Sequence, residues 1–581
     1  MAQPATLYTG RRLTTIAIFI AAAVGLIGRG IDLQFRDRQF LQSHGDARIL
    51  REVKTPAHRG VIVDRLGEPL AISTPVSSVW ANPRKLSLSN AQWKSLATML
   101  DVDGGVLQGL VAARKDREFV YLKRQVPPDV AALVSAGDFK GVGVDREFRR
   151  YYPAGEVAAH LLGFTNVDDS GQEGLELAYD QYLRGAAGAK RVIKDNLGRV
   201  VENVENVRAA VPGQNLVLSI DKRIQYVAYR ELKAAVFANR AQSGSMVILD
   251  SRTGEVLAMV NQPSYNPNNR SGLRGEYFRN RALTDVFEPG STLKPFTIAA
   301  ALESGEFKPS TPIETGPGFF NVGQYKVRDI HNYGTLNVSS VITKSSNVGA
   351  AKIALALEPQ QLWRMLSAVG FGAPSNTGFP GEAPGRLTDF RHWREIEQAT
   401  LAFGYGLSAN ALQLAQAYTA LANDGSMTPV SFLKLDRAPP GRRVMSPGTA
   451  LEIRAMLETV IRSGTGRLAH IAGYRVAGKT GTVHKTAARG YAEDRYLSLF
   501  AGMVPASNPR LVAVVVVDDP RNGEYFGGRV AAPVFGSVMQ EALRLLNIPP
   551  DEPLENGEQL YAYVAPASAE SFDDMGHRPE P

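Results

Sequence analysis

The chain has 581 residues, of which 44% are hydrophobic, and a formal net charge of +8. This length is enough for several domains with their own cores. The charge is small for the length, and no dense Lys/Arg run is interleaved with aromatic residues, which argues against a nucleic-acid partner. The absence of cysteine excludes disulfides, thiolate catalysis and cysteine-ligated metal. The eight histidines lack metal-binding spacing, so neither a metal nor another cofactor is expected.

An apolar segment near the N-terminus is expected to anchor the chain in a membrane. Arg11 and Arg12 precede the segment 13–33, which Arg29 interrupts. The uncharged run is slightly shorter than the roughly 20 residues that span a bilayer, but the arginine side chain can reach the interface and let the span continue. A cleaved signal peptide and a twin-arginine export signal are the alternatives. Positive charge before the span places residues 1–12 in the cytoplasm and the rest outside.

The next part of the chain is expected to be non-catalytic. Residues 34–56 are charged and thinly apolar, which is typical of a linker leaving the membrane. From 57 to 210 short helical and strand-like patterns alternate, beginning with a predicted hairpin over 59–71 and ending near a turn at 195–198. No serine–base pair or carboxylate cluster with a convincing role occurs in this range. We therefore expect a separate, non-catalytic module.

A second domain is predicted over 211–548. Its expected elements are, in chain order, a helix from Lys222 to about Val236, strands at 245–250 and 255–260, a helix start at Ser291, strands at 497–504 and 511–517, and a closing helix over 533–546. The first two strands flank a tight turn and predict a hairpin at the centre of a sheet. The tail, residues 549–581, is acidic and rich in Pro and Ala, which is typical of disorder.

The first chemical signal in this domain is Ser291, with Lys294 three residues later. An apolar run follows and ends at Gly305, so a helix starting here would bring both side chains to one face. A serine hydroxyl becomes nucleophilic when a base takes its proton, and a partly buried lysine can be that base. The free amides at a helix start suit an oxyanion. Taken alone, the pattern is more typical of a capped helix with a surface lysine.

Two further patterns follow in order. Ser345 and Asn347 lie at a break between two helical runs, where side chains can point into a cleft, although both residue types also cap helices well. Lys479, Thr480 and Thr482 then fall in a predicted strand over 476–483, together with the intervening Gly481. Its small residues let another backbone approach closely. The lysine offers a positive charge, and the threonines offer hydroxyls for a carboxylate.

The order Ser-x-x-Lys, Ser-x-Asn, Lys-Thr-Gly characterises penicillin-binding proteins and serine β-lactamases. The chain resembles the class B penicillin-binding proteins, most closely the cell-division penicillin-binding protein 3 family. Further matching stretches are Arg29-x-x-Asp32-Leu33-Gln34, Arg59-Gly60, Asp64-Arg65-x-Gly67, Arg149 to Gly155, and Val286 to Ser291.

The resemblance implies an α/β (α+β) fold. A transpeptidase domain with an antiparallel sheet flanked by helices would follow an elongated α+β pedestal of the dimerisation type and a single membrane helix. The chain has neither the room nor the motif for the glycosyltransferase domain of bifunctional class A members.

The resemblance also implies roles for the motif residues. Ser291 would attack the penultimate D-Ala carbonyl of a stem peptide ending in D-Ala-D-Ala, with Lys294 as general base. Ser345 would relay a proton to the leaving D-Ala, and Asn347 would hold the substrate amide and orient the base. Lys479 would tune the electrostatics of the site.

In the same family pattern, Thr480 and Thr482 would bind the substrate's terminal carboxylate, and Gly481 between them would also belong to the substrate-binding strand. The backbone N–H groups of Ser291 and Thr482 would form the oxyanion hole. Tyr405 and Tyr525, each on a segment between predicted elements, are expected to line the cleft.

The implied function is a D,D-transpeptidase that cross-links septal peptidoglycan and is acylated by β-lactams. The second motif, however, carries Ser346 where the Ser-Asp-Asn form has Asp, and no Glu-x-x-Leu-Asn segment lies between Asn347 and Lys479. Both features argue against a class A β-lactamase. An elongation-specific transpeptidase and a D,D-carboxypeptidase remain alternatives. Intact motifs argue against a non-enzymatic scaffold or β-lactam sensor.

The resemblance finally implies a place in the cell and partners. The protein would sit in the bacterial inner membrane with its catalytic domain in the periplasm. Besides stem peptides and β-lactams, a polytopic glycan polymerase and small bitopic division proteins are the expected partners. They would contact the anchor and the 57–210 module.

Overall fold

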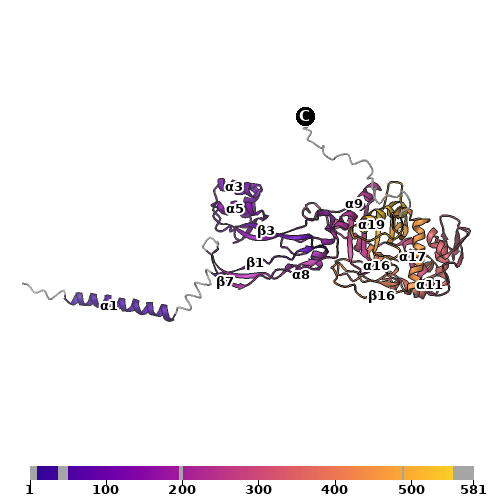
Figure 1. The fold of residues 1–581 in the computed structure, drawn as a ribbon. Helices are drawn as coiled ribbons and strands as arrows, with labels where there is room; N and C mark the ends of the chain where they lie inside the picture. The colour runs from indigo at the N-terminus through magenta and orange to yellow at the C-terminus, as the bar shows by residue number, and fades with distance from the viewer. Residues whose placement is uncertain (1–8, 37–49, 195–199, 487–489, 554–581) are drawn as a thin grey trace, which may run out of the picture. The chain divides into compact units, whose positions relative to one another are not determined.

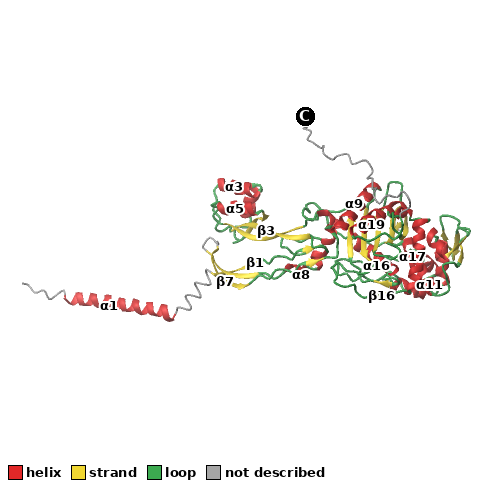
Figure 2. Ribbon diagram, in the orientation of Figure 1, coloured by secondary structure: helices red, strands yellow, loops and turns green. Residues whose placement is uncertain are grey.

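The computed structural model describes residues 9–36, 50–194, 200–486 and 490–553, and Figure 1 labels several of its helices and strands. Contacts divide the chain into two compact units. The first unit comprises Met1–Gly60, Ser73–Arg150 and Gln181–Gln214, and the second comprises Val61–Ile72, Tyr151–Asp180 and Asn215–Pro581. Both contain helices and strands, as Figure 2 shows, so the predicted mixed α and β class is confirmed.

An apolar helix forms the N-terminal end of the described chain. α1 (Thr9–Ile31) continues into the short π-helical turn η1 (Asp32–Arg36). The stretch Gly10–Gln34 is long and apolar enough to cross a membrane, and its most apolar window is not buried against the protein. The hydroxyls of Thr14 and Thr15 donate to carbonyl oxygens four residues earlier, which satisfies them on an apolar helix. This helix coincides with the predicted anchor, as expected for a membrane-anchored protein.

The first unit contains a three-stranded antiparallel sheet in the order β1-β6-β7, formed by β1 (Leu50–Thr55), β6 (Gly188–Lys194) and β7 (Val200–Arg208). Strand β1 corrects the predicted linker over 34–56, because the end of that stretch pairs with β6 along its whole length. Residues 37–49 of the linker and the whole turn predicted at 195–198 lie outside the described residues.

A second layered part of the first unit packs helices on strands. Its elements are β3 (Pro69–Ala81, which enters both units), β4 (Val120–Val126), β5 (Val142–Tyr151), α3 (Asn90–Leu100), α4 (Gly104–Ala112) and α5 (Pro128–Ala136). α3 begins at a capping box, in which Ser89 and Gln92 satisfy each other's backbone N–H groups. Leu96, Leu107 and Leu122 lie in the shared apolar core.

The second unit is built on a five-stranded antiparallel sheet in the order β10-β9-β19-β18-β17. Its strands are β9 (Ser243–Asp250), β10 (Val256–Gln262), β17 (Ala477–Thr486), β18 (Tyr491–Val504) and β19 (Leu511–Asp518). The predicted β9–β10 hairpin is present but does not form the centre of the sheet. β19 is central, because its unbroken apolar run is buried on both faces.

Helices cover this sheet. α9 (Lys222–Ala238) and α19 (Ala532–Leu545) share one apolar core with the strands, including Leu232, Phe500 and Phe535. α16 (Ala411–Ala422), which is buried along its whole length, also contacts three strands of the sheet. Figure 2 shows these helices around the strands of the second unit.

The remaining elements are mostly short. They are β2 (Ile62–Val63), η2 (Gly155–Val157), α6 (Ala159–Leu162), α7 (Gly174–Ala178), α8 (Asp180–Arg184), β8 (Leu216–Val217), η3 (Gly275–Tyr277), α10 (Arg281–Thr284), η4 (Gly290–Leu293), α11 (Lys294–Glu303), β11 (Pro312–Glu314), β12 (Phe319–Val322), β13 (Tyr325–Arg328), β14 (Thr335–Asn337), α12 (Val338–Lys344), α13 (Asn347–Ala356), α14 (Pro359–Ala368), η5 (Phe390–His392), α15 (Glu395–Leu401), β15 (Ser426–Met427), β16 (Arg442–Arg443), α17 (Pro447–Arg462), η6 (Arg467–Ala469) and α18 (Gly527–Val530).

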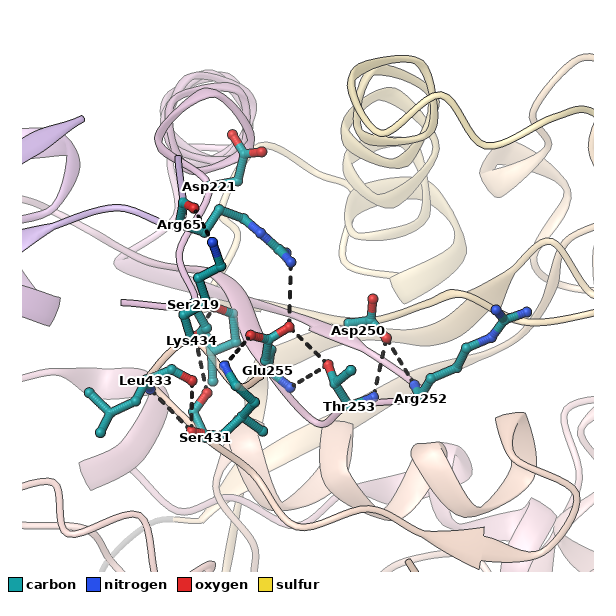
Figure 3. A network of polar contacts seen from close by, with 12 residues as sticks. Arg65, Ser219, Asp221, Asp250, Arg252, Thr253, Glu255, Ser431, Leu433 and Lys434 are labelled. Atoms are coloured by element: carbon teal, nitrogen blue, oxygen red, sulfur yellow. Dashed lines mark hydrogen bonds and ion pairs between the residues drawn. The ribbon is translucent and has the colours of Figure 1, made fainter. Parts of the chain in front are cut away.

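The segment 61–72 belongs to the second unit, although the sequence placed it in the non-catalytic module. β2 pairs with β3 as the predicted hairpin and lies parallel to β8. Figure 3 shows Arg65 in a network around Glu255, whose buried carboxylate also accepts from the Thr253 hydroxyl. The amine of Lys434 donates to the carbonyl oxygen of Arg65. Polar contacts around the buried Glu255 therefore hold this segment against the β9–β10 hairpin.

The first residues of the predicted disordered tail, 549–553, lie against the second unit instead. The carboxylate of Asp551 accepts from the backbone N–H of Arg475 at 2.7 Å and from the hydroxyl of Ser507. Residues up to 553 are thus part of the second unit. The rest of the predicted tail lies outside the described residues.

Replacement of Asp64 by Ala should destabilise the second unit by about 3 kcal/mol. Its fully buried carboxylate accepts from the N–H groups of Leu66, Glu68 and Lys222, and its loss removes the acceptor that holds these three N–H groups together. Asp389→Ala, which removes a partly exposed carboxylate that caps η5, should have a smaller effect. Thermal unfolding of both variants measures this, and equal losses would contradict the assigned role.

Candidate active site

Ser291 lies in the 3-10 turn η4, and Lys294 is the first residue of the following helix α11. The prediction of a helix start is therefore close, although the two residues belong to successive elements. The Thr292 hydroxyl donates to the carbonyl of Pro289, and the Tyr418 hydroxyl donates to the carbonyl of Thr292. Ser291 is half-buried, whereas Lys294 is fully buried. The turn thus fixes a reachable hydroxyl beside a buried amine.

Close backbone contacts hold this turn on two sides. A Cβ at Gly290, where φ is +54°, would lie 2.4 Å from a methyl carbon of Val483. A Cβ at Gly404, where φ is +88°, would lie 2.1 Å from the Gly290 carbonyl oxygen. On β17, a Cβ at Gly481 would approach Thr292 to 3.1 Å. The glycines therefore let β17 and the 403–406 turn pack directly against the nucleophile segment.

The amine of Lys294 joins the first two motifs. It donates to the side-chain oxygen of Asn347 at 2.7 Å, to the Ser345 hydroxyl at 3.2 Å and to the Ser345 carbonyl. Ser345 ends α12 in the left-handed conformation, with φ at 60°. Asn347 begins α13. The predicted break between two helices is confirmed, and it brings both side chains onto the buried amine.

A second buried lysine approaches the same hydroxyl from β17. The Lys479 amine donates to the Ser345 hydroxyl at 3.0 Å and to the Thr480 carbonyl at 3.1 Å. Burial lowers the pKa of Lys479 to about 7. The pKa of Lys294 falls well below its usual value because of burial and then the charge on Lys479, while Asp329 opposes the shift.

These shifts have a chemical consequence. An amine with a lowered pKa is neutral in a larger fraction of molecules near neutral pH, so Lys294 can accept a proton there. The Ser345 hydroxyl lies within hydrogen-bond distance of both amines. It is therefore placed to pass a proton between groups in the site.

The other predicted binding residues lie on β17, which is an edge strand of the described five-stranded sheet. The hydroxyls of Thr480 and Thr465 lie 2.6 Å apart. The Thr482 hydroxyl accepts from the N–H of Gly527 at 3.0 Å, which leaves its own proton to donate. An edge strand offers N–H and C=O groups to an extended peptide.

The two tyrosines predicted to line the cleft lie on different segments. Tyr405 follows Gly404, and its ring packs edge-on against Tyr491 at 5.6 Å. Tyr525 stacks on Tyr496 at 4.1 Å, two residues before the Gly527 that binds Thr482. The structure thus places Tyr405 next to the Gly404 that packs on the nucleophile turn, and Tyr525 against β18.

Glu288, which lies in the matching stretch Val286 to Ser291, holds the nucleophile segment to its surroundings. One carboxylate oxygen accepts from the Gly406 N–H at 2.8 Å and from the Tyr491 hydroxyl at 3.0 Å. Burial raises the pKa of this carboxyl, although both hydrogen bonds oppose the rise.

Sequence reasoning missed Asp329, Gly404 and Thr465. Asp329 binds the loop of the second motif, Gly404 packs on Gly290, and Thr465 meets Thr480. Each reaches its partner from a separate segment of the chain. No local spacing pattern signals these contacts.

The geometry agrees with comparisons to known proteins. Residues 244–540 match the Penicillin binding protein transpeptidase domain, and residues 54–218 match the Penicillin-binding Protein dimerisation domain. The chain belongs to the penicillin-binding transpeptidases. It is 43% identical to the peptidoglycan D,D-transpeptidase FtsI of Escherichia coli, over 92% of this chain and 91% of that protein.

Two further family members extend the comparison. The chain is 42% identical to a Pseudomonas aeruginosa protein named "Probable peptidoglycan D,D-transpeptidase PbpC", over 93% of this chain and 96% of that protein. The transpeptidase domain of penicillin-binding protein 3 from Burkholderia pseudomallei has 47% identity and a TM-score of 0.54, covering 58% of this chain and 98% of that one. The family and fold predicted from the motifs are confirmed.

The Gly290–Gly404 contact predicts a difference between two neighbouring glycines. Gly404→Ala should slow acylation by a penicillin about a hundredfold, because the new Cβ would push the nucleophile turn out of position. Gly406→Ala shares the positive φ, at +85°, but its Cβ meets nothing closer than 4.0 Å. The acylation rate of Gly406→Ala should therefore fall much less. Acylation rates of both full-length variants measure this, and equal rates would contradict the steric argument.

Proposed function

We propose that this penicillin-binding transpeptidase is a peptidoglycan D,D-transpeptidase of septal wall synthesis, with Ser291 as its nucleophile. The observation that carries the proposal is the fully buried Lys294 amine, three residues from a reachable serine and hydrogen-bonded to Ser345 and Asn347. A buried amine with a lowered pKa suits the base that such a serine requires. The similar proteins FtsI and PbpC are named as peptidoglycan D,D-transpeptidases, which supports the substrate class.

Acylation follows from these positions. The Ser291 oxygen attacks the carbonyl carbon of the penultimate D-Ala, and its proton passes to neutral Lys294. The backbone N–H groups of Ser291 and Thr482 stabilise the negative oxygen that forms. When the C–N bond breaks, the proton returns through Ser345 to the amine of the departing D-Ala. An ester on Ser291 and free D-Ala remain.

The second half-reaction restores the serine. The amine of another stem peptide attacks the ester, loses a proton to the lysine–serine system and forms the cross-link. A β-lactam enters the same first step, but its opened ring stays attached and blocks the acceptor. We expect its hydrolysis to be slow, because the chain lacks the Glu-x-x-Leu-Asn segment between Asn347 and Lys479.

Substrate binding uses the edge of the sheet. An extended stem peptide can pair with β17 by main-chain hydrogen bonds, and the absent side chain of Gly481 permits close approach. Lys479, Thr480 and Thr482 hold the terminal carboxylate by charge and hydroxyl donors. Asn347 binds the substrate amide, while Tyr405 and Tyr525 line the cleft.

The location and partners are part of the proposal. The apolar helix α1 with Arg11 and Arg12 on its N-terminal side supports an inner-membrane anchor, a cytoplasmic N-terminus and a periplasmic catalytic domain. A polytopic glycan polymerase and bitopic division proteins are the proposed partners. They would supply new glycan strands and confine cross-linking to the septum.

Labelling with a fluorescent penicillin tests the nucleophile. Full-length protein should form a covalent adduct that survives denaturation, and Ser291→Ala should form none because no oxygen remains to be acylated. Ser340→Ala, a serine on α12, should label like the wild type. Absence of label on the wild type would defeat the proposed activity, and a labelled Ser291→Ala would assign the wrong nucleophile.

Depletion from cells tests the septal role. Loss of the protein should give filaments, because septal cross-linking would stop while elongation continues. Cell length after depletion measures this, and a plasmid copy should restore division unless it carries Ser291→Ala. Round cells would instead indicate the elongation-specific alternative. Release of D-Ala without cross-linked product, in the presence of an acceptor peptide, would indicate a D,D-carboxypeptidase.

A further inference from the structure

A carboxylate from outside the second motif holds its loop. Asp329 directly follows β13. One of its oxygens accepts from the N–H groups of Asn347 at 2.5 Å and Val348 at 3.0 Å, and the other accepts from the Ser346 hydroxyl at 2.5 Å. The Ser346 oxygen in turn accepts from the N–H of Gly349 at 2.8 Å. Asp329 and Ser346 together thus satisfy the first free donors of α13.

The same hairpin end also fixes the Asn347 side chain. The Asn347 amide nitrogen donates to the Arg328 carbonyl at 3.2 Å, while its oxygen accepts from Lys294. Two adjacent residues of the chain, Arg328 and Asp329, therefore hold both the backbone and the side chain of Asn347. Ser345, one residue before this anchored pair, keeps a left-handed backbone that is unfavourable for serine. Anchoring of Ser346 and Asn347 makes that backbone tolerable.

We propose that Asp329 is a positioning residue for the transpeptidation reaction: from a separate segment, it supplies the carboxylate that Ser-Asp-Asn motifs carry at their middle position. In this chain the middle position is Ser346, and its hydroxyl donates a hydrogen bond to Asp329. Removal of the carboxylate releases the loop, so Ser345 and Asn347 are no longer held within hydrogen-bond distance of the Lys294 amine. This role rests on the proposed function, since the loop serves the acylation step.

The negative charge of Asp329 also affects the pKa of Lys294. Two charged groups face the Lys294 amine: Lys479 on β17, which lowers its pKa, and Asp329, which raises it. Lys294 acts as a base when neutral, so the acylation rate rises with pH through the pKa of this lysine. Loss of the negative charge lowers that pKa further. The rising limb of the rate–pH profile should then move to lower pH.

The test uses full-length protein in detergent and the rate constant for acylation by a fluorescent penicillin. Asp329→Asn should lower the maximal rate roughly tenfold or more, the scale of one charge-assisted hydrogen bond, and shift the rising limb to lower pH. Asp103→Asn, which changes an acidic helix cap in the first unit, should alter neither. An unchanged rate and profile in Asp329→Asn would overturn the proposal.

A variant that moves the carboxylate from residue 329 to residue 346 distinguishes a positioning role from a general loss of stability. Ser346→Asp alone should slow acylation, because two carboxylates would meet where Ser346 now touches Asp329. Combined with Asp329→Asn, it should acylate faster than either single variant. A double variant no faster than Asp329→Asn would overturn the proposal, even if both singles have lowered melting temperatures. Failure of the proposed function would appear separately, as wild-type protein that takes no label.

Discussion

The structure depends on one constraint, the burial of two lysine amines around a single serine hydroxyl. Lys294 and Lys479 are both fully buried, and both donate to Ser345. Burial of a charged amine is unfavourable, and two positive charges at close range repel each other, so the neutral form of one amine is favoured. More of that amine is therefore neutral near neutral pH, and only the neutral form can accept the serine proton. The chemistry of the site follows from this burial.

The fold meets this constraint by making the surroundings rigid. The nucleophile turn is held by β17, by Gly404 and by the carboxylate of Glu288. The sheet itself is packed by α9 and α19 through a continuous apolar core. Close-packed walls of this kind do not relax easily, so the amines cannot move to solvent. Stability of the second unit and reactivity of its serine therefore have the same structural source.

Residues close in sequence were predictable, whereas contacts between distant segments were not. Each of the three motifs has its residues at short spacings: Ser291 with Lys294, Ser345 with Asn347, and Lys479 to Thr482 on β17. Local hydrophobic patterns then predicted the helices and strands that carry them. The central position of β19 depends on pairing with β9 and β18, which no local pattern encodes. The attachment of segment 61–72 to the second unit is likewise a matter of long-range polar contacts. Propensity describes an element but not its neighbours.

The second motif shows why this limit matters for function. By sequence, Ser346 is a departure from Ser-Asp-Asn, and the motif alone therefore lacks an acid. In the structure the acid is present, because Asp329 reaches the same loop from the end of β13. A sequence motif therefore indicates which chemical groups a site needs, and a distant segment of the chain can supply one of those groups. A missing residue in a motif signifies lost chemistry only when no other segment brings an equivalent atom to its place.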